Sequence, residues 1–198
     1  MFYKFMRGIA KLILKLPRRL KYEGVENIPE EGPVLLIANH QHFGDPVLMG
    51  LATNREVYFL GKEELLKGSR IRRWFFDHLN VIPLDREGVD RNAIKRAIKV
   101  LKDGGVLGVF PEGTRSKDGK LLPFKTGACF IASQAPCTIV PMGIRYDDPL
   151  FKYFGKPVKV KVGKSFPYEA LEGEKRKETQ GRMLKKQEEA VFSLLKDE

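Results

Sequence analysis

Short apolar runs alternate with longer amphipathic stretches along this chain, and that alternation restricts the possible folds most strongly. The runs at 34–38, 105–110 and 138–144 have the length of strands that are buried on both faces. The stretch 89–103 has a helical pattern, with one apolar face made of Ile94, Ala97, Ile98 and Leu101. Because strands that alternate with helices form parallel sheets covered by helices, we predict a single-domain α/β sandwich with a largely parallel mixed sheet.

The remaining pattern places this domain at 20–198, behind a separate helical segment at 1–19. The alternation of valine and lysine in Val158–Val162 predicts a half-exposed strand at an edge of the sheet. The other expected elements are strands at 20–25, 57–60, 80–84 and 157–163, helices at 46–53 and 126–135, short helices through 63–79, and a C-terminal helix from about residue 176.

A histidine and an aspartate follow the first buried run, in the string Asn39-His40-Gln41-His42-Phe43-Gly44-Asp45-Pro46. Four residues separate His40 from Asp45, so the two side chains do not share a helix face and the chain must bend between them. Gly44 permits such a turn, and Asp45 before Pro46 predicts a helix that has Asp45 as its N-cap. The carboxylate can then accept a hydrogen bond from one imidazole nitrogen and leave the other as a base. Alternatively, Asp45 is only a cap and His40 only a loop residue.

The buried run at 105–110 leads into the string Pro111-Glu112-Gly113-Thr114-Arg115-Ser116. Ligands of α/β proteins bind at the ends of strands, and there Arg115 offers a guanidinium that can pair with phosphate through two bonds. Gly113 lets the backbone approach a ligand closely. The two strings together predict a site that deprotonates a hydroxyl on a phosphate-bearing substrate, although the second string alone also fits an ordinary surface turn.

These strings resemble those of the glycerolipid acyltransferases, most closely the 1-acylglycerol-3-phosphate (lysophosphatidic acid) acyltransferases. Four sequence blocks of that family occur in order over most of the chain. They are Asn39–Asp45 with the family's His-x4-Asp pattern, Val81-Ile82-Pro83-Leu84-Asp85-Arg86, Phe110–Ser116, and Ile139-Val140-Pro141-Met142-Gly143-Ile144. The family usually has serine at the position of His42, so His42 is a second candidate for the base, although only His40 has an aspartate at the family's spacing.

The resemblance implies transfer of a fatty acyl group from an acyl thioester to the 2-hydroxyl of 1-acylglycerol-3-phosphate, which gives phosphatidic acid for phospholipid biosynthesis. His40 would be the general base and Asp45 its partner, without a metal or redox cofactor, and the donor would be acyl-CoA or an acyl carrier protein. The residues expected to bind the acceptor are Arg86, Glu112, Gly113, Thr114, Arg115 and Lys125. The alternatives are acylation of glycerol-3-phosphate or another lysolipid, and a catalytically idle peripheral membrane protein of the same fold.

Positive charge is concentrated at the start of a chain whose net charge is +11. Residues 1–22 hold seven lysines or arginines and no acidic residue, and large apolar residues fill the other helical face. This pattern predicts a basic amphipathic helix that lies in an anionic membrane interface, with the protein peripheral on the cytoplasmic face. The segment is too interrupted by charge to span a bilayer and lacks the pattern of a signal peptide. Alternatively, the helix packs on the domain and its basic face is only solvated.

A second basic stretch, Lys67–Phe76, contains Trp74 and two phenylalanines, which suits either a membrane interface or a helix whose aromatic side chains join the core. No recognisable nucleic-acid-binding module is present, so we expect no nucleic-acid partner. The two cysteines, Cys129 and Cys137, have neither disulfide nor metal-site spacing and are expected to be small buried side chains.

Overall fold

The computed structural model describes residues 2–15, 20–65, 69–70, 73–74, 78–85, 90–146 and 158–196. Within these residues, eight strands form one sheet in the order β1-β7-β6-β2-β5-β3-β4, and β8 pairs with β6. The strands are β1 (Leu20–Glu23), β2 (Val34–Ala38), β3 (Val57–Lys62), β4 (Val81–Leu84), β5 (Val106–Val109), β6 (Thr138–Tyr146), β7 (Val158–Val162) and β8 (Phe166–Pro167). The helices are α1 (Phe2–Lys15), α2 (Asp45–Leu51), α4 (Arg91–Lys102), α5 (Gly127–Gln134) and α6 (Arg176–Leu195), with short 3-10 helices η1 (Val25–Asn27) and η2 (Glu63–Leu65).

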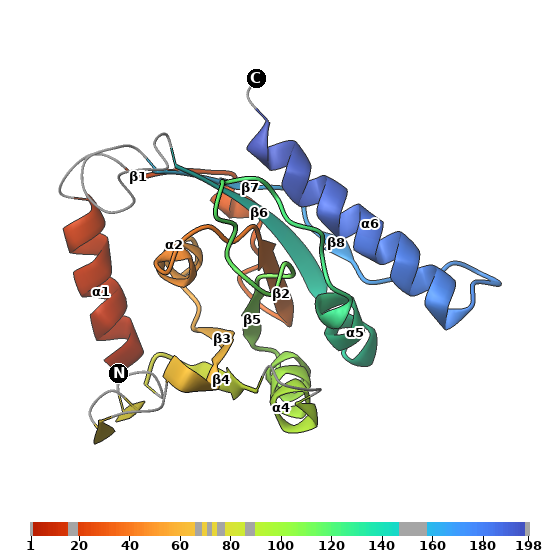
Figure 1. The fold of residues 1–198 in the computed structure, drawn as a ribbon, viewed down its shortest axis with the longest axis horizontal. Coiled ribbons are helices and arrows are strands. Elements are labelled where there is room, and N and C mark those ends of the chain that lie inside the picture. The colour runs from red at the N-terminus through yellow and green to blue at the C-terminus, as the bar shows by residue number, and fades with distance from the viewer. Residues whose placement is uncertain are drawn as a thin grey trace.

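Helices cover both faces of the sheet, which confirms the predicted α/β sandwich. Figure 1 shows α1 and α2 on one side of the sheet and α4, α5 and α6 on the other. Because side chains alternate along a strand, Leu35 and Ile37 of β2 pack among residues of α4, α5 and α6, whereas Leu36 of the same strand packs with Leu48 and Met49 of α2. The wholly apolar sequence of β2 therefore follows from burial on both faces.

The central position of β2 determines which parts of the chain can form a site. β2 runs parallel to β5 on one side, with Ile37 opposite Val109, and parallel to β6 on the other, with Ala38 opposite Met142. The carboxyl ends of these three strands consequently lie at the same edge of the sheet. The segments that follow β2 and β5, together with the last residues of β6, meet there.

One expectation about the strands was wrong, and one strand was not expected. β7 is not an edge strand, because it lies between β1 and the antiparallel β6. The period-two pattern correctly predicted the partial exposure of Lys159 and Lys161. A strand with one half-exposed face can nevertheless pair with a neighbour along both of its edges. β1 covers the edge away from β6, and Lys159 forms an ion pair of 2.9 Å with Glu23 of β1. The two-residue strand β8 was not expected, since two residues carry no periodicity.

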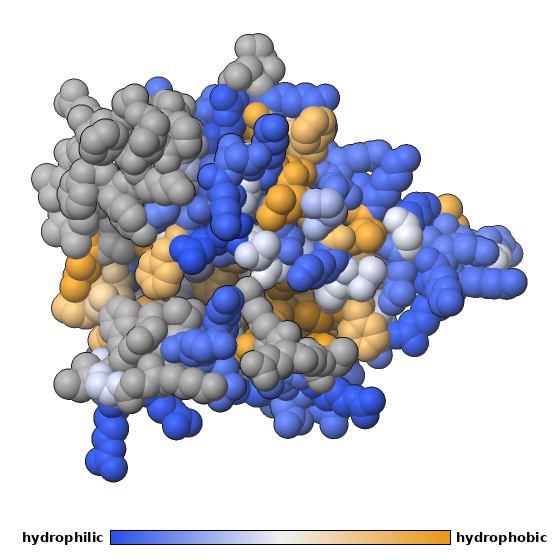
Figure 2. Space-filling model, viewed as in Figure 1, coloured by the Kyte–Doolittle hydropathy of each residue, from blue (hydrophilic) through white to orange (hydrophobic). Residues whose placement is uncertain are grey.

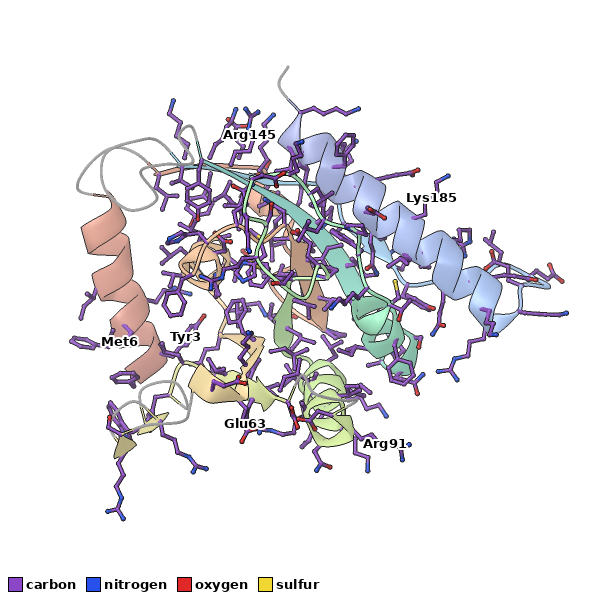
Figure 3. All side chains as sticks on the ribbon, viewed as in Figure 1. Tyr3, Met6, Glu63, Arg91, Arg145 and Lys185 are labelled. Carbon is purple, nitrogen blue, oxygen red and sulfur yellow. The ribbon has the colours of Figure 1, made fainter. Side chains whose placement is uncertain are left out.

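α1 packs against the domain and also exposes apolar side chains. The Tyr3 hydroxyl accepts a hydrogen bond of 3.2 Å from the Val57 backbone N–H, and Arg7 donates to the Thr53 carbonyl at 2.8 Å. Figure 3 shows Tyr3 on the side of α1 that faces β3 and Met6 on the other side. Phe5 is 64% exposed, and Figure 2 shows apolar surface on the side of the molecule where α1 lies.

The second basic and aromatic stretch falls mostly on residues 66–68, 71–72 and 75–77, which lie outside the described residues. Trp74 is described, is about half exposed, and its ring meets Phe2 of α1 edge-on at 4.8 Å between centroids. In the part of the chain that the structure describes, no helix combines the length and the apolar character needed to cross a bilayer.

Candidate active site

His40 and Asp45 meet at the carboxyl end of β2. The Nδ1 atom of His40 lies 2.8 Å from Oδ2 of Asp45, across the bend that the intervening residues make. A carboxylate only accepts hydrogen bonds, so this contact places the imidazole proton on Nδ1 and leaves Nε2 with a free electron pair. The ring stacks on Phe110 with a centroid distance of 4.1 Å and an interplanar angle of 19°, which fixes its plane. Its side chain is 16% exposed, so a substrate can still reach it.

Asp45 is not the N-cap of α2, contrary to expectation. It is the first residue of the helix, and Gly44, which has no side chain to cap the helix, occupies the N-cap position. The carboxylate turns back into the preceding loop instead, where Oδ2 accepts hydrogen bonds of 2.7 Å from the backbone N–H groups of both Gln41 and His42. The carboxylate therefore organises the loop that carries His40 rather than the end of the helix.

Glu112 holds the two predicted strings together. Oε1 of Glu112 accepts from the His40 backbone N–H at 2.6 Å, and Oε2 accepts from the Leu122 N–H at 2.9 Å. The His40 carbonyl in turn accepts from the Ser116 N–H at 2.8 Å, so the second string bonds both the amide and the carbonyl of His40. Glu112 is only 2% exposed, and this burial raises its pKa to about 6 even though the two N–H bonds act in the opposite direction. The predicted contact between Glu112 and the acceptor stays a prediction.

The turn after β5 presents cations beside the dyad. Gly113 has φ of 72°, a left-handed conformation that favours glycine, and an added Cβ would lie 3.0 Å from Nζ of Lys125. Thr114, Arg115 and Lys125 are exposed. Among the described residues, neither Arg115 nor Lys125 has an ion-pair partner, so both charges are available to an anion. Arg86, the other expected phosphate contact, lies outside the described residues.

His42 occupies a different environment from His40. Its ring is buried, Nδ1 accepts from the Gly44 N–H at 3.0 Å, and a Cβ on Gly44 would lie 3.3 Å from that nitrogen. Gly44 therefore lies close to this ring, and its backbone angle is not unusual, since its φ is −80°. Of the two imidazoles, it is His40 that bonds to the Asp45 carboxylate through its ring.

The roles of two residues, Asn39 directly after β2 and Tyr146 at the end of β6, were missed from sequence. The side-chain amide of Asn39 bonds both the N–H and the C=O of Ile144, at 2.7 and 2.9 Å, and so extends the pairing of β2 with β6. The hydroxyl of Tyr146 donates to Oδ1 of Asp45. A polar residue at the end of a strand parallel to β2 was the available signal for Tyr146, but the neighbouring strands of β2 were not known from sequence.

Both cysteines are buried, as expected. Burial raises the pKa of the Cys129 thiol to about 12 and that of Cys137 to about 11. Since the thiolate is the nucleophilic form, neither thiol is activated for attack on an acyl group.

Comparison with known proteins shows which family this chain resembles. A family model described as Acyltransferase matches residues 19–145. The 1-acyl-sn-glycerol-3-phosphate acyltransferase of Bacillus subtilis (strain 168) is 31% identical over 140 residues, which cover 70% of this chain and 69% of the relative. The protein of the same name from Streptococcus pneumoniae is 34% identical over 154 residues, covering 76% of this chain but 56% of the relative.

A solved structure supports the same assignment over nearly the whole chain. The crystal structure of the 1-acyl-sn-glycerophosphate (LPA) acyltransferase PlsC from Thermotoga maritima aligns with a TM-score of 0.72 at 26% identity, over 97% of this chain and 79% of that chain. The family match spans His40, Asp45 and the whole turn from Glu112 to Arg115. This chain therefore belongs to the acyltransferase family.

Proposed function

We propose that this chain transfers a fatty acyl group from an acyl thioester to the 2-hydroxyl of 1-acylglycerol-3-phosphate and so makes phosphatidic acid for phospholipid biosynthesis. The observation that carries the proposal is the 2.8 Å contact between His40 and Asp45 next to a turn with available cations. The names of the bacterial relatives support the choice of acceptor.

The reaction follows from the orientation of the imidazole. Nε2 of His40 takes the proton of the acceptor hydroxyl while its oxygen attacks the thioester carbonyl carbon. Asp45 stabilises the imidazolium that forms, because its charge lies against Nδ1–H. The C–S bond then breaks and the leaving thiolate receives the proton from His40. No acyl-enzyme is required, in keeping with the two buried, weakly acidic thiols.

The acceptor phosphate is proposed to bind at the turn after β5. Arg115 supplies the planar guanidinium that suits phosphate, and Lys125, whose Nζ lies close to Gly113, supplies a second cation. Thr114 is exposed beside them as a hydroxyl donor. Arg86 follows β4 closely in sequence and is proposed to join this site.

The protein is proposed to work as a peripheral protein on an anionic membrane surface at the cytoplasmic side. Exposed apolar side chains occur on α1 and beside the dyad, with Phe5 on α1, Phe43 in the His40 loop and Val47 on α2. α1 packs against α2, so these side chains belong to neighbouring elements. The net charge of +11 favours anionic headgroups.

Replacement of the dyad tests the proposal. His40→Ala should lower acyl transfer by about 10²- to 10⁴-fold, the usual contribution of a general base, while His42→Ala remains active. Asp45→Asn should also be severe, because the neutral amide lacks the charge that stabilises the imidazolium. Thiol release is measured with acyl-CoA and acyl carrier protein donors, against 1-acylglycerol-3-phosphate, glycerol-3-phosphate and a second lysolipid. An active His40→Ala protein together with an inactive His42→Ala protein would refute the assignment.

A further inference from the structure

Tyr146 is the last residue of β6, the strand that runs parallel to β2 (Figure 1). The two strands pair up to Ala38 and Met142, and the Asn39 side chain continues that pairing to Ile144. Tyr146 is thereby carried beyond the paired region to the loop that connects β2 with α2. Arg145, labelled in Figure 3, marks this end of β6.

The contacts of Tyr146 involve the dyad loop. Its hydroxyl donates a hydrogen bond to Oδ1 of Asp45, and its ring meets His42 edge-on at a centroid distance of 5.8 Å. The other oxygen of the same carboxylate, Oδ2, accepts from His40 Nδ1 and from the backbone N–H groups of Gln41 and His42. The carboxylate is fully buried. Tyr146 of β6 therefore bonds Oδ1 of Asp45, whereas His40 bonds Oδ2.

Rotation about the Cβ–Cγ bond of Asp45 moves both carboxylate oxygens, so the donor on Oδ1 adds to the three donors on Oδ2 in resisting that rotation. Hydrogen bonds to a charged acceptor are stronger than neutral ones. The Tyr146 hydroxyl thus fixes the carboxylate plane and directs Oδ2 toward His40 Nδ1.

We infer that Tyr146 is a positioning residue for acyl transfer, which acts on His40 through the carboxylate of Asp45. This inference rests on the proposed function, since it assigns Tyr146 a part in that reaction. Tyr146 itself needs no contact with either substrate.

Tyr146→Phe removes the hydroxyl and keeps the ring against His42. The expected result is a fall of about tenfold in kcat, which corresponds to one hydrogen bond to a charged group, with KM for donor and acceptor unchanged. Tyr22→Phe is the matched control, because the Tyr22 hydroxyl donates to the Leu48 carbonyl of α2 at 2.8 Å but does not bond Asp45. The control should lose some thermal stability and keep its kcat.

A double variant, Tyr146→Phe with Asp45→Asn, tests whether Tyr146 acts through Asp45 or lowers activity independently of it. If Tyr146 acts through Asp45, adding Tyr146→Phe to Asp45→Asn should cost little further activity, whereas independent roles would give the full tenfold loss again. An equal loss in both backgrounds, an effect on KM alone, or the same loss in Tyr22→Phe would overturn the inference.

A second measurement does not depend on activity. The Nδ1 proton of His40 should give a protected, downfield NMR signal in the wild-type protein, and Tyr146→Phe should make it exchange faster with water. Unchanged exchange would contradict positioning even if kcat falls. An inactive wild-type protein would instead refute the proposed function, and the exchange rate would still decide whether Tyr146 holds the dyad.

Discussion

At the scale of single residues, backbone groups determine the geometry of the dyad as much as side chains do. The Asp45 carboxylate accepts hydrogen bonds from two backbone N–H groups in addition to the imidazole, and Glu112 and Ser116 bond the backbone N–H and C=O of His40. All of these bonds are internal to the protein. The base is therefore held in its reactive orientation before binding, which is the condition for catalysis by positioning.

Glu112 should give this protein an unusual dependence of stability on pH. Its pKa is raised from 4.5 to about 6, so its contribution to stability is present below pH 4.5 and is lost as the pH rises through 6. Relative to Glu112→Gln, the wild type should lose about 2 kcal/mol of unfolding free energy between pH 4.5 and 7. Urea unfolding of both proteins at several pH values measures this difference. The contributions of the other titrating groups cancel, because both proteins contain them.

Glu174 provides a control of opposite sign. Hydrogen bonds from Arg182 lower its pKa, with the Leu171 N–H acting in the same direction. Relative to Glu174→Gln, the wild type should therefore become more stable as the pH rises through the acid range. If the difference in unfolding free energy between the wild type and Glu112→Gln does not change with pH, the buried, ionised state of Glu112 at neutral pH is contradicted.

Arg115 should contribute to recognition of the acceptor but not of the donor. Arg115→Lys keeps the charge and loses the planar fork, so KM for 1-acylglycerol-3-phosphate should rise about tenfold, the equivalent of one charge-assisted bond. The same result is expected for Arg86→Lys. Arg91→Lys, at an exposed arginine that begins α4, is the control and should leave both KM values unchanged. Equal changes for donor and acceptor would count against a phosphate contact.

At the scale of elements, α6 carries a polar side chain where its pattern demands an apolar one. Met183, Gln187 and Val191 follow one another at four-residue spacing on the buried face of the helix. Gln187 is fully buried, and neither its Nε2 nor its Oε1 has a hydrogen-bond partner in the described part of the chain. The helix is expected to dock despite this residue because its apolar neighbours supply the packing.

Gln187→Met should make the protein more stable. The substitution conserves volume and removes two buried polar groups without partners, so we expect a gain of about 1 to 3 kcal/mol in the free energy of unfolding. The midpoint of urea unfolding measures this gain. Gln180→Met, at a half-buried glutamine of the same helix, should have little effect. A lower midpoint for Gln187→Met would mean that the amide is hydrogen-bonded in solution.

At the scale of the whole molecule, sequence predicted the layers well because burial on two faces leaves a strong pattern. The apolar runs located β2, β5 and β6, and the helical face at 89–103 located α4. Sequence did not show the order of strands, since pairing joins residues far apart in the chain. For that reason Tyr146 and the backbone bonds of Glu112 were missed, although the contact between His40 and Asp45, only five positions apart, could be predicted.

Membrane binding should depend on the side of the molecule where α1 lies. Phe5→Ser should weaken binding to anionic vesicles about tenfold or more, as expected for loss of one buried phenylalanine. Phe192→Ser, at an exposed phenylalanine of α6 on the other side of the sheet, should not (Figure 1). Added salt should reduce binding of the wild type without abolishing it, because screening removes only the charge contribution. Vesicle sedimentation measures the binding of both variants and the salt dependence of the wild type. Equal losses of binding for Phe5→Ser and Phe192→Ser would refute a membrane-binding surface on the side of α1.

The residues that bond the loop carrying the dyad come much later in the sequence, and this has a consequence for folding during translation. His40 is bonded by Glu112, 72 residues later, and Asn39 by Ile144, 105 residues later. On the ribosome, β2 therefore emerges long before either of its neighbouring strands, as an apolar strand with both edges open. Open apolar edges recruit other chains. A translation product that stops before β6 is thus expected to be an aggregating chain and a chaperone client, and catalytic competence arises only when the strand that ends at Tyr146 has joined the sheet.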